Sequence, residues 1–326
     1  MKSVKPICFY TILHPLVDAC SVTVLVVGGM AWQRVLAYNA LAFALQLPLG
    51  GVLDVRPQLV KGSFVASLAL TLAGVGLCAC GGETGVHSLL LENVALVLAC
   101  VGNALFHLSA GKTVLDTHEG KGGPIGLFIS TGALGLFAGM KLAGGYGFWC
   151  CLGFGAALAA VGTAAALWIN SDSSEASPTF RRIRRVSVVS DEIGVGNGRR
   201  IGRLILFGLF ALVAWRSWAG LLAGGMTNAA GLGFALAGAA VTWAGKAACG
   251  YIGDSFGRWT VTAVSVAGSL SLCFLCRPEQ AALWLALLFV AQLATGPVLS
   301  LMYDKSGRAG GTAFGLNCLA LFTGSL

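Results

Sequence analysis

The sequence predicts an all-α membrane protein with ten full transmembrane helices and part of an eleventh, and three observations support this. Hydrophobic residues make up 56% of the 326 positions and charged residues only 10%, whereas a soluble chain has about a quarter charged residues. The apolar residues fall in runs of about 20, the length that crosses a bilayer core. The basic residues lie mostly in alternate loops. This composition excludes a water-soluble enzyme, a disordered chain and a secreted disulfide scaffold.

The apolar runs are long and unbroken. Strands of a membrane barrel would be half as long and would alternate in polarity, so helices are the better interpretation. An eleventh run begins near Thr312 and is still apolar at Leu326. We expect the ten full helices at about 7–30, 34–53, 62–80, 89–110, 125–144, 147–170, 201–223, 228–252, 259–276 and 281–303.

The placement of positive charge predicts the orientation. With the N-terminus in the cytoplasm, that side holds 16 of the 21 Lys and Arg residues, and the opposite loops hold two. This is the asymmetry of the positive-inside rule, so we expect a multi-pass protein of the cell (inner or plasma) membrane. The single long loop, 171–200, is rich in Ser, Gly and Arg and is typical of a flexible cytoplasmic linker. It separates a six-helix bundle at 1–170 from an incomplete bundle at 201–326.

Motifs for cofactors and for nucleic acid are weak. The basic cluster in the linker has no interleaved aromatic residues, so nucleic-acid binding is not expected. The C-x-x-C at Cys273 and Cys276 has no second pair, so neither a metal site nor a disulfide framework is expected. Gly111-Lys112-Thr113 resembles the end of a P-loop, but Phe106 replaces its first glycine. Nothing in these motifs therefore suggests nucleotide hydrolysis or a bound cofactor.

An internal repeat relates the two halves. Gly50 and Asp54 follow the second predicted helix, and Gly250 and Asp254 follow the eighth, with an offset of 200 residues. The loops before the fifth and eleventh helices match loosely, Gly122-Gly123 against Gly310-Gly311. Repeats in the same direction predict two bundles related by an axis along the membrane normal.

The second copy, G-x-x-x-D-x-x-G-R, resembles the signature of the major facilitator superfamily. The resemblance implies twelve helices, so part of the eleventh and all of the twelfth would be missing. It also implies that the glycines allow close helix contact and that the aspartates hold a cytoplasmic gate closed. In the first copy Pro57 and Gln58 replace the Gly-Arg end. The gate set is Gly50, Asp54, Arg56, Lys246, Gly250, Asp254, Gly257 and Arg258, in which Lys246 either reaches the gate carboxylates or extends to the interface.

Two shorter motifs resemble the fosmidomycin-resistance-like branch of that superfamily. They are the run Gly102 to His107 and the triplet Arg216-Ser217-Trp218. The branch implies export, and the superfamily implies that the first, fourth, seventh and tenth helices line a central cavity.

Ionisable residues inside the predicted helices are the candidate site. His14 and Asp18 are spaced i,i+4 and share one helix face, as do Asn103 and His107. A carboxylate at this depth should protonate or find a cation. The group is therefore either a proton-coupling site or a buried polar contact that fixes helix packing.

Arg216 is the candidate anion anchor. Under the 200-residue offset it matches Leu16, at the depth of His14 and Asp18. Its guanidinium suits bidentate capture of a carboxylate or phosphonate, and the alternative is a salt bridge to Asp18 with no ligand role. Trp218 could supply a stacking wall or could face lipid.

Together these features predict a proton-coupled secondary transporter of a small organic anion or drug, preferably by efflux. A proton symporter that imports such an anion is the first alternative, and a non-transporting or truncated membrane protein is the second. An enzyme is not expected, because no H-E-x-x-H, paired intramembrane aspartates or G-x-S-x-G motif is present. The expected partners are the substrate and the bilayer, and the expected state is a monomer.

Overall fold

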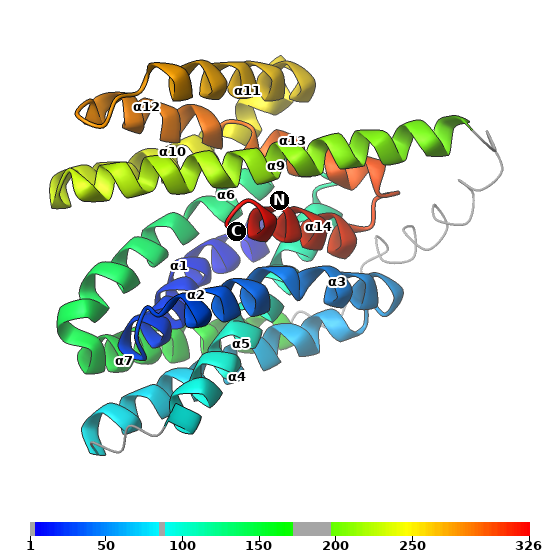
Figure 1. Ribbon diagram of the computed structural model, residues 1–326. Coiled ribbons are helices and arrows are strands. Elements are labelled where there is room, and N and C mark those ends of the chain that lie inside the picture. The colour runs from blue at the N-terminus through cyan, green and yellow to red at the C-terminus, as the bar shows by residue number, and fades with distance from the viewer. Residues whose placement is uncertain (1–3, 85–88, 172–196) are drawn as a thin grey trace.

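The computed structural model describes residues 4–84, 89–171 and 197–326, and every regular element in these ranges is helical (Figure 1). Within them, nine ranges are long and apolar enough to cross a membrane. The all-α, multi-pass architecture predicted from the sequence is therefore confirmed. The predicted linker falls almost entirely on 172–196, outside the described residues.

The first of the crossing-length ranges is formed by α1 (Val4–Val27). The second is built from α2 (Trp32–Asn39), the π-helical turn η1 (Ala40–Ala44) and α3 (Gln46–Val55). Then come α4 (Leu59–Thr84) and α5 (Leu89–Thr117). The π-helical turn lies at the middle of its span, where the Gln46 side chain donates to the Ala42 carbonyl at 2.6 Å.

The fifth range explains why the helix count differs from the predicted one. It runs from Gly122 to Trp168 through α6 (Gly122–Ser130) and most of α7 (Gly132–Ser171). Its 47 residues are about twice the length that one crossing needs. Tyr146 interrupts α7 with non-helical φ −133° and ψ 35°, and the green ribbon turns back on itself in Figure 1. The range covers the two helices predicted at 125–144 and 147–170.

The second half begins with α9 (Asn197–Ala229), α10 (Leu232–Phe256) and α11 (Arg258–Leu275). One further crossing is shared by α12 (Ala281–Gln292) and α13 (Thr295–Lys305). The last helix, α14 (Gly310–Thr323), has 14 residues, fewer than the roughly 20 that a full crossing needs.

The two halves lie side by side, with α9 to α13 in the upper part of Figure 1 and α1 to α5 in the lower part. The two most extensive contacts between the halves are those of α14 with α3 and of α10 with α6. Both contacts depend on glycine, because a Cβ on Gly50 would overlap the backbone of Gly311, and one on Gly250 would overlap the backbone of Gly122.

Candidate functional site

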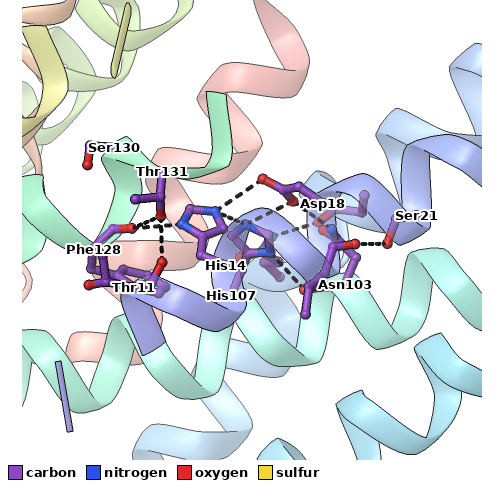
Figure 2. Close-up of polar contacts among 12 residues, drawn as sticks. Thr11, His14, Asp18, Ser21, Asn103, His107, Phe128, Ser130 and Thr131 are labelled. Atoms are coloured by element: carbon purple, nitrogen blue, oxygen red, sulfur yellow. Dashed lines mark hydrogen bonds and ion pairs between the residues drawn. The ribbon is translucent and has the colours of Figure 1, made fainter. Parts of the chain in front are cut away.

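The Asp18 carboxylate is the centre of a buried polar cluster between α1 and α5 (Figure 2). Asp18 is 5% exposed, and its Oδ1 accepts a hydrogen bond from Asn103 Nδ2 at 2.9 Å. Its oxygens also lie 3.2 Å from His14 Nε2 and 3.4 Å from His107 Nε2. The structure thus brings together the two pairs that the sequence placed on separate helix faces. We call Asp18, His14 and His107 the proton triad.

Both histidine rings have a fixed tautomer. His14 Nδ1 lies 2.7 Å from the Phe128 carbonyl oxygen, and His107 Nδ1 lies 2.9 Å from the Asn103 carbonyl oxygen. A carbonyl oxygen only accepts hydrogen bonds, so each Nδ1 carries a hydrogen and donates it. A neutral ring therefore presents a bare Nε2 to the cluster.

The two Nε2 atoms lie 2.6 Å apart, which requires a further proton. Without it, two lone pairs would face each other beside a carboxylate, an arrangement of three acceptors and no donor. With one proton between them, one ring is an imidazolium that donates to the other, and its charge balances that of Asp18. The geometry is that of a triad holding one shared proton.

A metal ion fits this geometry less well. Each member of the triad offers one ligand atom, and these atoms lie within 4.8 Å of one another. Two nitrogens bound to one metal at about 2.1 Å would, however, lie about 3 Å apart at a right angle, farther than the observed 2.6 Å. A shared proton accounts for the short distance directly.

Glycines on α7 make room for the triad, and nothing in the sequence pointed to them. A Cβ on Gly132 would meet His14 Nε2 at 2.6 Å and would overlap Asp18 Oδ2. A Cβ on Gly135 would overlap the backbone of Pro15. The spacing of these glycines on one helix indicates a helix contact, but nothing in it identifies α1 as the partner.

Arg216 on α9 is buried without a carboxylate partner among the described residues. It is 6% exposed, and Nη1 donates to Gln292 Oε1 on α12 at 2.8 Å. Its Nε is buried and has no hydrogen-bond partner. The salt bridge to Asp18, the alternative that the sequence allowed, is not formed, because that carboxylate contacts the triad histidines and Asn103 instead.

Lys246 on α10 lies near this guanidinium. Its neighbour Gly245 packs on Gln292, where an added Cβ would meet the Gln292 Cβ at 2.9 Å. Gln292 links the two residues, because it packs on Gly245 and hydrogen-bonds to Arg216, and Lys246 itself is half-buried. The sequence placed Lys246 with the gate set, whereas the structure places it with the central charges. Gln292 was missed, because a lone glutamine in an apolar run carries no motif.

Trp218 lies apart from these groups. Its side chain is 48% exposed, and its ring is 5.2 Å from that of Trp215. Trp215 in turn donates to Ser269 on α11 at 3.2 Å. Trp215 therefore contacts the neighbouring helix α11, and the half-exposed Trp218 ring packs against Trp215.

The repeated aspartates each cap a helix of the opposite half. Asp54 accepts from the backbone nitrogens of Gly311 at 2.9 Å and Thr312 at 2.7 Å, and from Thr312 Oγ1 at 2.7 Å. Asp254 accepts from the backbone nitrogens of Gly122 at 3.0 Å and Gly123 at 2.9 Å. A helix N-terminus favours an anion, because its first amides are unpaired and its dipole is positive there. We call these contacts the two aspartate caps.

Lys112 completes the first cap. Its ammonium lies 2.6 Å from Asp54 Oδ1 and 2.8 Å from Asp116 Oδ2. In the sequence, this lysine belongs only to an incomplete P-loop match. Asp116 lies one turn along the same helix, whereas the contact with Asp54 could have been found only with the helix pairing in hand.

The remaining gate residues are more exposed. Arg258 lies 2.6 Å from Asp304, and both side chains are about a third exposed. Gly257 has φ +93° between α10 and α11, a conformation that glycine adopts readily. Arg56, after α3, is exposed.

The fold is similar to that of known transporters. No protein-family model and no curated protein matches the chain. The crystal structure of a major facilitator superfamily transporter, FucP, in the outward conformation has a TM-score of 0.69 and 14% identity, covering 98% of this chain and 89% of that one. A point variant of the E. coli fucose:proton symporter FucP has a TM-score of 0.66 and 14% identity, covering 99% and 90%.

These similarities define the fold class. The chain has the major facilitator fold over nearly its whole length, as the resemblance in the sequence implied. The two similar structures belong to a transporter rather than to an enzyme.

Proposed function

We propose that the protein is a proton-coupled secondary transporter of a small organic anion that works by alternating access. The observation that carries the proposal is the 2.6 Å contact between His14 and His107 beside Asp18. An intramembrane group that binds one reversible proton, in a fold used by transporters, is the element that proton coupling needs.

Loss of the shared proton would change the packing of α1 against α5. The two bare Nε2 atoms and the Asp18 carboxylate would then repel one another, so the three side chains would separate. A substrate or a conformational change that alters their spacing would release or take up the proton by the same linkage.

The aspartate caps would close one side of the transporter. They join α3 to α14 and α6 to α10, which belong to opposite halves, and alternating access requires both contacts to break. By the positive-inside rule this side is cytoplasmic, so we assign the N-terminus to the cytoplasm. We also propose that the chain lies in the plasma or inner membrane and works as a monomer.

For the direction of transport we propose export, on the resemblance of the 102–107 and 216–218 motifs to an exporter branch. Import is the second candidate function. A specific observation favours it, because one of the similar structures is described as a proton symporter.

The test uses purified protein in proteoliposomes with an imposed pH gradient. In the Asp18→Asn variant, we expect proton-driven flux to be abolished while some substrate exchange persists, because the amide cannot balance an imidazolium. Full proton-driven transport by this variant would refute the proton assignment. A substrate is found first by thermal-shift screening of organic anions against wild type and Arg216→Ala. A ligand that stabilises only the wild type identifies both substrate and anchor.

A further inference from the structure

We propose that the substrate is a small organic dianion held between Arg216 and Lys246. The inference rests on the proposed transport function and specifies its substrate class. It follows from the balance of charge at the centre of the molecule, where the buried Arg216 and the half-buried Lys246 add two positive charges to a triad that is itself neutral.

The triad carries no net charge when it holds its proton. One imidazolium balances Asp18, whose oxygens are occupied by His14, His107 and Asn103. Arg216 and Lys246 therefore remain as two cations without an ion pair among the described residues. Charges in a membrane interior are costly unless an opposite charge accompanies them. A ligand with two negative charges would make the loaded centre neutral.

The guanidinium is oriented for a ligand. Gln292 holds Nη1, and Gln292 Oε1 also accepts from Thr295 Oγ1 at 3.2 Å. Because Oε1 is fixed from two sides, the arginine is held in place by a neutral group. The Nε of Arg216, buried and unpartnered, is then left to donate to one carboxylate oxygen, the pattern of charge-assisted recognition.

Lys246 supplies the second charge close by. Gly245 packs on Gln292, and Gln292 bonds to Arg216, so the backbone at Lys246 is tied to the arginine through one shared side chain. Lysine acts as a flexible point charge. This combination fits an anion with one carboxylate for Arg216 and a second negative group a few atoms away.

Arg34 provides a contrast within the same chain. It too has buried nitrogens without partners, but its Nη1 lies 3.1 Å from Glu92 Oε2, so that guanidinium already has a carboxylate. Among the described residues, the Arg216 side chain hydrogen-bonds to an amide and to no carboxylate. Of these two buried guanidinium groups, the one at the centre is therefore the one that lacks a counter-ion.

The experiment compares diacids with their monoamides, which have the same size but one negative charge fewer. The purified full chain is titrated with malonate, succinate and glutarate and with the three monoamides, and binding is measured by calorimetry and thermal shift. For wild type we expect at least one diacid to bind more tightly than its monoamide by on the order of tenfold, the factor that one charge-assisted hydrogen bond supplies.

Two variants lower the net charge of the centre by one unit, each by a different route. Lys246→Gln deletes the ammonium, and Gln292→Glu gives Arg216 an internal carboxylate. In both, we expect the preference to move from the diacid to its monoamide. Lys141→Gln is the matched control, because Lys141 is an exposed lysine in α7, and it should keep the wild-type preference.

Each outcome decides the inference. Equal binding of diacids and monoamides, binding of no diacid by the wild type, or unchanged selectivity in both variants would overturn it. None of these results concerns the proton, which the Asp18→Asn flux assay tests by itself. Proton-driven flux without charge selectivity would refute the dianion site and leave the transporter proposal standing. Charge-selective binding without proton-driven flux would support the dianion site and refute the proposal of proton-coupled transport.

Discussion

Replacing Asp54 by Asn should weaken the first aspartate cap by an amount that can be worked out from its contacts. The carboxylate accepts from the Gly311 and Thr312 amides, from the Thr312 hydroxyl and from the Lys112 ammonium. An asparagine keeps one acceptor oxygen, but its NH₂ group turns a donor toward the other donors. At least two of the four hydrogen bonds are then lost.

The magnitude follows from the charge on the acceptor. A hydrogen bond to a charged group contributes about 1.5–3 kcal/mol, so losing two costs the closed arrangement about 3–6 kcal/mol. At 1.4 kcal/mol for each factor of ten, this corresponds to a shift of about 10²–10⁴ toward the open form. The same loss should appear at the α14 N-terminus, whose amides the carboxylate holds.

Hydrogen exchange measures this directly. In Asp54→Asn, peptides covering residues 309–313 should lose protection by up to the same factor, while those from the middle of α5 should not. Asp304→Asn is the control. It breaks the partly exposed ion pair with Arg258, and a surface pair contributes only about 0–1 kcal/mol. Wild-type protection at Gly311 and Thr312 in the Asp54→Asn variant would show that the cap does not hold the two halves together.

Three further outcomes are expected. Gly132→Ala should push Asp18 away from His14 and lower the stability by about 1–3 kcal/mol in thermal unfolding. The control Gly144→Ala, with open space around its Cα, should leave the stability unchanged. Equal effects of the two substitutions would argue against tight packing at the triad. His107→Gln should release about one proton fewer per molecule on base titration in weakly buffered detergent, because the shared proton loses its second nitrogen; unchanged proton release would refute the shared-proton geometry. Trp218→Ala should alter ligand affinity by less than about twofold, because its ring is half exposed and packs against Trp215. A large loss of affinity in calorimetry would instead return Trp218 to the binding site.

The sequence predicted the features that lie within one helix. Apolar run length predicted the spans, and the i,i+4 spacing of His14 and Asp18 predicted that they share a face. These features depend only on local geometry, which the chain order determines.

Contacts between helices were beyond such reasoning. The 2.6 Å approach of His14 to His107 depends on how α1 crosses α5, and periodicity carries no information on that crossing. The same holds for Gln292, which matters only because α12 brings it to Arg216. Lys246 was assigned by its distance along the chain from Asp254, although helix rotation turns it toward the central charges.

Helix α5 carries both His107 of the proton triad and Lys112 of the first aspartate cap, five residues apart. Five residues of α-helix span about 7.5 Å, and the segment between them is unbroken helix. A displacement of α5 that parts His107 from His14 therefore moves Lys112 relative to Asp54 in the same step. The protonation of the triad and the closure of one side of the transporter would then both depend on the position of α5, with no relay of side chains between them.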